Sequence, residues 1–458
     1  MNYLLFFTVF FSLIGFYFLL ALYVSRKIKT TTDYFLAGRN LGFFYVTLTL
    51  VATQIGGGML LGTSQEAYNV GLYGIMYTIG MSFGFLLLGL GFASKLQSLN
   101  VSTTAALFET KYNSPFLKKI ASLLSIATMF GILVGQVVAS RALLEGIGVT
   151  NELIFLGFWA FIITYTILGG LKAVAITDSA QVIFVILVFG GIFLYALSGE
   201  PTSFFSFASL ANIQSMFPPE TITLTKLTGI ALMPALFSLI EQDLAQRFFA
   251  SRTKKIAAFS AITASAFLLM FSLVPIYFGM KAKMLGMTFS GSPLLPYLAQ
   301  ITNEFVLILA ICGIIAAIMS TGDSLLCAVS SNLSLDFDFS FTGITNKLRL
   351  SKIITFIIGI GAIAASYLVS KNIISILVGS YEISVSCLLV PLLVSYFRSN
   401  LNKNAAIGSI IFGLTGFILF RLYPIAFPKE IVSIGLSILG YVLFNFLAPK
   451  KRLVPVEN

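Results

Sequence analysis

The sequence predicts an all-α protein that crosses a membrane many times. Of its 458 residues, 58% are hydrophobic and only 10% are charged, whereas soluble domains carry about 25% charged residues. The apolar residues gather in runs of roughly 20, which is the length at which a helix spans the hydrocarbon layer. These runs do not alternate with polar residues as the strands of a membrane barrel do. Helices are therefore the remaining way to satisfy the backbone inside lipid.

About thirteen apolar segments follow one another along a single transmembrane domain, residues 1–458, with no polar linker long enough to form a second one. The segments lie near residues 3–25, 43–66, 71–95, 118–147, 151–168, 178–197, 224–248, 255–279, 302–335, 352–370, 372–398, 404–424 and 430–447. The first lacks the basic start and small-residue cleavage site of a signal peptide, so we expect it to be retained as a helix.

The positive charges predict how the chain is oriented. With a cytoplasmic C-terminus, 21 of the 28 Lys and Arg residues fall in inner loops, as the positive-inside rule requires. We therefore expect a multi-pass protein of the cell inner (cytoplasmic) membrane, with its N-terminus outside and its partner the lipid bilayer. This distribution accounts for the net charge of +11 without a nucleic-acid partner.

Two of the segments contain helix-breaking residues. Segment 43–66 holds Gly56, Gly57 and Gly58, and segment 224–248 holds Pro234. A glycine costs a helix about 1 kcal/mol against alanine, and proline removes a backbone donor. Paired interruptions in two halves of a chain are typical of a transport site. The alternative is that the glycines only permit close helix packing.

The two broken segments lie five segments apart, which is the spacing of a five-plus-five inverted repeat. This predicts a first repeat over 43–197 and a second over 224–398. An extra helix and a cytoplasmic loop precede them in 1–42, and two further helices follow in 404–447.

Polar groups inside the apolar segments are candidate functional residues because they are costly in lipid. Ser320, Thr321 and Ser324 place three hydroxyls within about one and a half turns, beside Asp323. Sodium is a hard cation, and hard cations bind such oxygens, so this cluster indicates a sodium site. The alternative is that each hydroxyl bonds a carbonyl of its own helix.

The chain resembles the sodium:solute symporter family. The most specific match is the stretch YTILGGLKAVAITDSAQ at 165–181. Further matches, in family order and together covering roughly residues 30–335, are DYFLAGR at 33–39, FETKY at 108–112, QR at 246–247 and AAIMSTGDS at 316–324. The glycines of 52–58, followed by Gly62, Thr63 and Tyr68, are similar to those of the choline-transporter branch.

The resemblance implies a LeuT-type fold with one helix before the two repeats and two after, and alternating access driven by sodium as the coupling ion. It implies a sodium site made of the carbonyls of Ala52, Ile55 and Ala317 and the hydroxyls of Ser320 and Thr321. It also implies, for some members, a second sodium, here held by Asp178 with Asp323 or Ser324. No organic cofactor and no enzymatic activity are implied, and the functional unit is expected to be a monomer.

The substrate is expected to be a small organic solute bound midway through the membrane. The residues expected to line its pocket are Gln54, Gly57, Gln136 and Glu241, although the two glutamines could instead bond across helices. Gln54 and Glu241 replace aromatic residues of a choline cage, so choline is not expected. Glu241 favours an amino acid or amine, and a sugar, a monocarboxylate or a vitamin stays open. Proton coupling through Asp178, Asp323 and Glu382 and, less favoured, a solute sensor are the alternatives.

Overall fold

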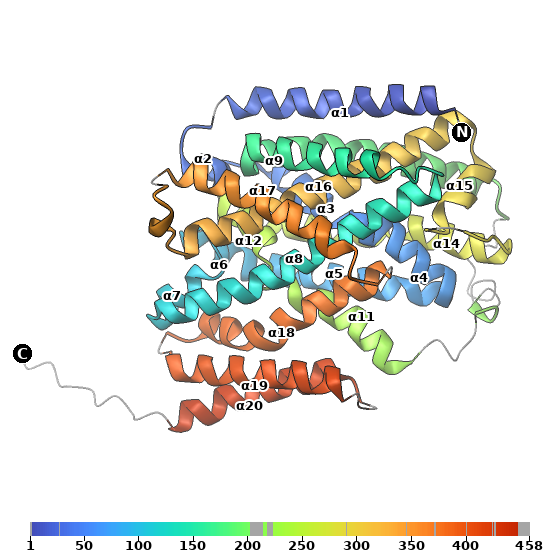
Figure 1. Ribbon diagram of the computed structural model, residues 1–458. Coiled ribbons are helices and arrows are strands. Elements are labelled where there is room, and N and C mark those ends of the chain that lie inside the picture. Colours follow the sequence, from blue (N-terminus) through green and yellow to red (C-terminus); the bar gives the residue numbers. More distant parts are fainter. Residues whose placement is uncertain are drawn as a thin grey trace, which may run out of the picture.

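The computed structural model describes residues 2–26, 28–201, 214–217, 223–289, 291–344, 346–370, 372–399, 401–423, 425 and 427–447. In these residues long helices lie alongside one another in one bundle (Figure 1). We call the end of the bundle where the described chain begins the N face, and the opposite end the C face (Figure 1). The basic residues Lys27, Lys371, Lys450, Lys451 and Arg452 lie outside the described residues.

Eleven helices of the described chain are long and apolar enough to cross a membrane. Seven of them match single predicted segments: α1 (Tyr3–Ser25), α8 (Pro115–Gly146), α16 (Glu304–Asp336), α17 (Lys347–Ser366), α18 (Ile373–Phe397), α19 (Lys403–Leu422) and α20 (Lys429–Leu447). The all-helical, membrane-spanning class is thereby confirmed. The exact number of thirteen crossings stays a prediction, because the other predicted segments are merged into longer helices or divided into shorter ones.

Helix α9 (Glu152–Ser198) joins two of the predicted segments. Its backbone leaves the helical conformation at Gly170, with φ 51° and ψ −167°. A Cβ there would lie 2.5 Å from the carbonyl oxygen of Tyr34, so both the positive φ and the close approach require glycine. The loop expected before residue 178 is thus mostly helical, and Asp178 lies about two turns beyond the kink rather than at a helix start.

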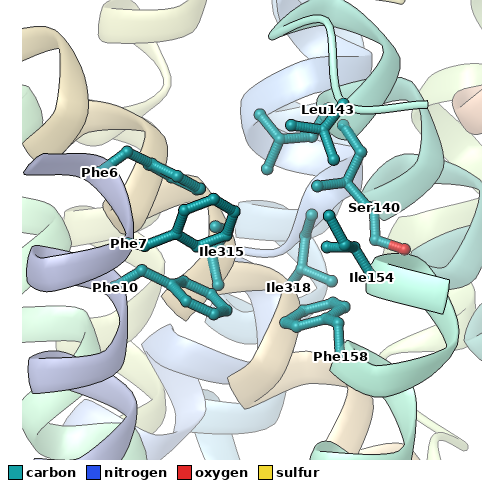
Figure 2. A pocket seen from close by; sticks show the side chains of 11 residues that line it. Phe6, Phe7, Phe10, Ser140, Leu143, Ile154, Phe158, Ile315 and Ile318 are labelled. Carbon is teal, nitrogen blue, oxygen red and sulfur yellow. The ribbon is translucent and has the colours of Figure 1, made fainter. Parts of the chain in front are cut away.

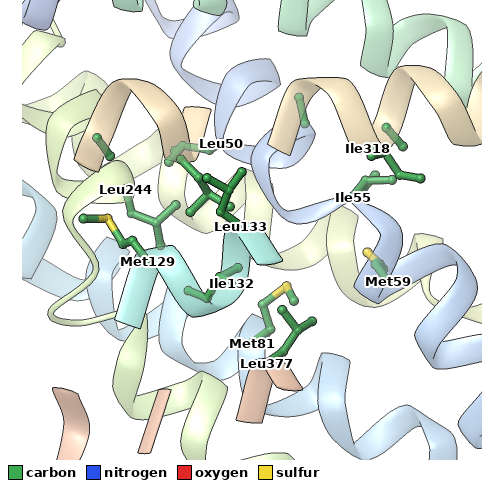
Figure 3. Packing of buried hydrophobic residues seen from close by; sticks show 14 of the residues in the cluster. Leu50, Ile55, Met59, Met81, Met129, Ile132, Leu133, Leu244, Ile318 and Leu377 are labelled. Atoms are coloured by element: carbon green, nitrogen blue, oxygen red, sulfur yellow. The ribbon is translucent and has the colours of Figure 1, made fainter. Parts of the chain in front are cut away.

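The first broken segment is interrupted where its glycines predict. Helix α3 (Phe43–Gln54) ends, Ile55 takes the non-helical angles φ −80° and ψ 68°, and the chain resumes as a π-helical turn η2 (Gly58–Gly62) and helix α4 (Thr63–Val70). Apolar side chains from neighbouring helices, including Leu133, Ile318 and Leu377, pack around this interruption (Figure 3).

The second broken segment is interrupted later than its proline predicts. Helix α11 (Leu224–Phe237) runs through Pro234, and the break falls between it and helix α12 (Gln242–Ala250). The carbonyl of Pro234 still accepts the backbone N–H of Ser238 at 3.1 Å and its hydroxyl at 2.8 Å. The missing donor of proline weakens the turn before it, whereas the chain leaves the helix only at Glu241, with φ −65° and ψ 125°.

The remaining helices connect and cover these elements. They are α2 (Thr31–Leu36), η1 (Ala37–Arg39), η3 (Gly71–Ile75), α5 (Met76–Leu87), η4 (Leu88–Phe92), α6 (Ala93–Ser98), α7 (Ala106–Tyr112), α13 (Lys254–Phe271), α14 (Leu273–Met284), α15 (Leu294–Ile301) and η6 (Ser340–Thr342). Helix α2 begins with a capping box, in which the Thr30 and Asp33 side chains accept each other's backbone N–H groups.

The extra helices lie on opposite sides of the bundle. Helix α1 packs on α9 and α16, and α19 and α20 pack on each other and on α18 at the other side (Figure 1). Phe6, Phe7 and Phe10 of α1 face Phe158 and Ile315 of the bundle across a small apolar space (Figure 2). The two broken segments and α8, α9 and α16 occupy the space between these outer helices.

Candidate functional site

The break in α3 lies against the hydroxyl cluster of α16. Ser320 donates its hydroxyl to the carbonyl of Ala52 at 3.1 Å and to that of Ala317 at 3.0 Å. Thr321 donates to the carbonyl of Thr53 at 3.0 Å and to that of Ala317 at 3.2 Å. The last carbonyls of a helix have no partner within it, so the end of α3 offers acceptors that these two hydroxyls use.

This arrangement suits a hard cation. The oxygens are backbone carbonyls and neutral hydroxyls, and Ser320 and Thr321 are 1% and 5% exposed. A hydroxyl that donates to a carbonyl still carries lone pairs that it can turn toward an ion. Four of the five predicted sodium ligands therefore meet at one point. Ile55, the fifth, lies at the break itself, but none of its described hydrogen bonds joins it to α16.

Glycine at position 56 makes the approach of the two helices feasible. A Cβ on Gly56 would lie 2.4 Å from the Thr321 hydroxyl oxygen and 2.9 Å from the amide oxygen of Gln136. A Cβ atom essentially never comes within 3.0 Å of a non-bonded heavy atom of another part of the chain. The sequence leaves open whether the glycines interrupt the helix or permit close packing, and in the structure they do both.

Gln136 supports the break from α8. Its side-chain oxygen accepts the backbone N–H of Gly57 at 2.8 Å, which is a donor that the interrupted helix leaves unpaired. This is the bond across helices that the sequence allowed as the alternative to substrate contact. The position of Gly57 is equally tight, since its Cβ would lie 2.3 Å from that of Ala139.

The two breaks meet through polar side chains. Glu241, 7% exposed at the start of α12, interacts with the side chain of Gln54 at the end of α3. Aromatic groups lie close by: the hydroxyls of Tyr77 and Tyr381 are 3.0 Å apart, and Phe237 stacks on Tyr381 with ring centroids 4.7 Å apart. Sequence reasoning missed these three residues, because they sit on separate helices and belong to no local motif.

A second polar cluster surrounds Arg247, whose side chain is fully buried. The guanidinium contacts Asp178 at 3.2 Å and Thr49 at 3.0 Å, and it also donates to the hydroxyl of Ser324. Asp178 and Ser324 do come together as the second sodium site requires, but a cationic side chain lies between them. The motif at residues 246–247 resembles the family in sequence, but it did not indicate which residues Arg247 contacts in the fold.

The other buried acids are divided between different surroundings. One oxygen of Asp323 accepts from Ser324 at 3.4 Å, and its Oδ2 has no hydrogen-bond partner among the described residues. Glu382 lies on α18 and pairs with Lys429 of α20 at 2.8 Å. The three acids considered for proton coupling thus do not converge on one point.

An all-helical bundle whose two broken segments meet beside a hydroxyl cluster is the architecture of a LeuT-type secondary transporter. The chain is similar to a solved structure of a Na⁺-coupled sialic acid symporter in its substrate-bound outward-open state. The TM-score is 0.82 at 18% identity, covering 97% of this chain and 98% of that one. It is also similar to MHP1, a nucleobase-cation-symport-1 family transporter in a closed conformation. There the TM-score is 0.62 at 13% identity, covering 92% and 97%. At these identities the likeness establishes the fold.

The sodium:solute symporter family model matches residues 34–413, so the chain belongs to that family. Among curated proteins it is 31% identical over 166 residues to "High-affinity choline transporter 1" of Caenorhabditis elegans. This match covers 34% of the chain and spans only 27% of that relative. The chain is therefore a member of a family of sodium-coupled membrane symporters.

Proposed function

We propose that the protein is a sodium-coupled symporter that imports a small organic solute, with sodium bound by Ala52, Ile55, Ala317, Ser320 and Thr321. The observation that carries this proposal is the pair of hydroxyl contacts from α16 to the carbonyls at the end of α3. An ion at this point is held by both helices at once. It therefore favours the conformations in which the first broken segment and α16 lie together.

Coupling follows from this shared position. Sodium that orders the break of α3 also orders Gln54 and Gly57, which we propose line the substrate pocket with Gln136 and Glu241. Each ligand then raises the affinity for the other by the same factor. Moving one positive charge inward gains about 2.3 kcal/mol per 100 mV of membrane potential, and this drives the solute with the ion.

The pocket favours a substrate with an ammonium group, such as an amino acid or amine. Glu241 supplies a buried carboxylate, and Phe237 and Tyr381 supply aromatic faces that also attract cations. A sugar, a monocarboxylate or a vitamin is the alternative. A thermal-shift screen of the purified protein against a metabolite library, with and without sodium, separates these classes.

The sodium site is tested without knowing the substrate. We expect sodium to raise the unfolding temperature of wild type above its value in potassium, because a ligand at 100 times its Kd adds about 2.7 kcal/mol of stability. We expect the double variant Ser320→Ala, Thr321→Ala to lose this shift. The matched control is Ser330→Ala, whose buried hydroxyl bonds, within the described part of the chain, only the carbonyl of Cys327 in its own helix. Equal sodium shifts in all three proteins would defeat the proposal.

Proton coupling is the second candidate function. The observation that favours it is the buried side chain of Asp323. A buried carboxylate with an unpartnered oxygen avoids the cost of an isolated charge by binding a proton or a cation. Uptake driven by a pH gradient in sodium-free buffer, and lost in Asp323→Asn, would support this candidate. Sodium-dependent uptake that survives in Asp323→Asn would reject it.

A second sodium at Asp178 with Asp323 or Ser324 remains a further prediction. Such an ion has to share these oxygens with the guanidinium of Arg247, which already contacts two of the residues. Sodium titration of the stability of wild type distinguishes the cases, because two ions give a steeper dependence on sodium concentration than one.

We propose that the N face is extracellular and that the protein lies in the cytoplasmic membrane. The three cysteines, Cys312, Cys327 and Cys387, are buried, so engineered cysteines can be labelled over a low background. A membrane-impermeant maleimide added to intact cells should label Lys283→Cys at the N face and not Lys403→Cys at the C face. The reverse pattern would overturn this orientation.

A further inference from the structure

A polar cavity of about 560 Å³ opens at the N face, away from the two breaks. It lies between α4, α11, α18, α19 and α20, and six charged residues line it: Glu66, Lys226, Glu382, Arg421, Lys429 and Glu430. Binding pockets for small molecules typically have about 300–1,000 Å³. The cavity is therefore large enough for a small metabolite.

Four of the six charges are already paired. Lys226 contacts Glu66 at 2.8 Å, and Lys429 contacts Glu382 at 2.8 Å. The two charges left over are the carboxylate of Glu430 and the guanidinium of Arg421, for which the described residues supply no ion-pair partner. They face the same cavity with opposite signs, yet they do not approach each other closely enough to form an ion pair.

Glu430 is the buried acid of the cavity that has no ion-pair partner among the described residues. It is 5% exposed, and its Oε2 has no hydrogen-bond partner among the described residues. An acid in the first turn of a helix such as α20 is favoured by the helix dipole. The dipole does not give Oε2 a hydrogen bond, and a buried acceptor without a donor costs stability. A donor that enters the cavity removes this cost.

Arg421 supplies the complementary half of the site. Its guanidinium lies 3.7 Å from the position a Cβ on Gly379 would take, at the wall formed by α18, and over the ring of Phe417. Unlike Glu430, the arginine is exposed, so it meets an incoming ligand first. A carboxylate is its natural partner, because the planar guanidinium donates two parallel hydrogen bonds.

We propose that this cavity binds a small zwitterion, whose ammonium group donates to Glu430 and whose carboxylate accepts from Arg421. A ligand with a single charge would satisfy only one of the two residues. The site is separate from the sodium site, because Tyr381 of α18 faces Tyr77 and the breaks, whereas the next residue, Glu382, faces the cavity.

The cavity is bounded on one side by residues of both broken segments. Glu66 belongs to α4 and Lys226 to α11, which are the halves of the two broken segments on the N-face side. The opposite wall, α18 to α20, lies outside both breaks. The two residues proposed to bind the zwitterion, Arg421 of α19 and Glu430 of α20, both lie on this wall, and neither belongs to the proposed sodium site.

The test is equilibrium binding to the full-length protein in lipid nanodiscs, in potassium buffer without sodium. The probes are the ω-amino acids from glycine to 5-aminopentanoate, with butylamine and butanoate as singly charged controls. At least one ω-amino acid should bind ten or more times more tightly than either control. Glu430→Gln and Arg421→Gln should each weaken that binding at least tenfold.

Three control variants separate this site from others. Glu304→Gln changes a carboxylate at the same face outside the cavity. Glu241→Gln alters the proposed substrate pocket, and the double variant Ser320→Ala, Thr321→Ala alters the proposed sodium site. Zwitterion binding should survive in all three, so it stands even if the sodium proposal fails. Loss of binding in Glu241→Gln but not in Glu430→Gln would place the ligand at the breaks and overturn the proposal.

Two further results would also overturn it. One is the absence of binding by every probe, which would make the cavity a structural ion network only. The other is equal binding of butylamine, butanoate and the zwitterions. Folding of each variant is checked by its thermal unfolding. If Glu430→Gln does not fold, the same test is made by comparing zwitterion binding in Arg421→Gln with binding in the conservative variant Arg421→Lys.

Discussion

Replacing Gly57 by alanine tests the packing on which the first break depends. Gly57 has φ −56° and ψ −33°, which any residue adopts, so space is the only obstacle to a side chain. The new Cβ would lie 2.3 Å from the Cβ of Ala139 on α8. Ordinary contacts begin at about 3.4 Å, so the helices have to separate by about 1 Å or distort.

The expected cost follows from that overlap. Forcing an extra carbon into a packed interior destabilises a protein by about 1–3 kcal/mol. Separating α8 from the break also lengthens the hydrogen bond from Gly57 to Gln136. We therefore expect Gly57→Ala to lower the unfolding temperature and to weaken the sodium-dependent shift together.

The reciprocal change on α8 should rescue the variant. Ala139→Gly alone costs about 1 kcal/mol of helix stability. It also removes the Cβ atom with which the new side chain of Gly57→Ala would clash. If the clash is the cause, the double variant is more stable than the sum of the single changes predicts by about 1–3 kcal/mol. Gly190→Ala is the control, because that helical glycine has nothing within 4 Å of its Cβ position. Additive effects of the two substitutions in thermal or denaturant unfolding would refute the reasoning.

Three further predictions concern other contacts. Arg247→Ala should destabilise by about 3–5 kcal/mol, because it leaves Asp178 as an uncompensated buried charge; adding Asp178→Asn should recover part of this in thermal unfolding, and no recovery would contradict it. Tyr77→Phe and Tyr381→Phe should each cost about 1–3 kcal/mol, since each orphans the other hydroxyl, and the double variant should cost less than their sum. The pKa of Asp33 lies below its ordinary value because the capping threonine donates to the carboxylate. The lowered pKa stabilises the fold above about pH 4. The stability gap between wild type and Asp33→Asn should therefore shrink from pH 7 to pH 3, and a constant gap would contradict it.

Periodicity and composition predicted the elements well, because the bilayer permits little else. The span of α1 is identical to its predicted segment, and the glycines of 56–58 placed the first break correctly. The second break lies about two turns beyond the proline that predicted it. Proline removes a donor toward the preceding turn only, so the chain continues until its backbone leaves the helical conformation at Glu241.

The candidate site was predictable only where a local motif carried it. The hydroxyls of Ser320 and Thr321 stand together in the sequence, and their partners at Ala52 and Thr53 lie at a visible helix break. No pattern indicated that Arg247 would lie between Asp178 and Ser324. Its partners come from three helices distant in the chain, and a sequence contains no distances.

By itself the sequence determined that this chain is a helical membrane protein with two interrupted segments and a cluster of hydroxyls. Lipid excludes unpaired backbone groups, so length and apolar character decide the helices before any packing forms. Only the tertiary structure decided which carbonyls those hydroxyls reach and which glutamine supports the break. The same holds for the two opposite charges left unpaired at the N face. Those outcomes depend on the approach of distant helices within a few ångströms, which close packing of the whole bundle sets.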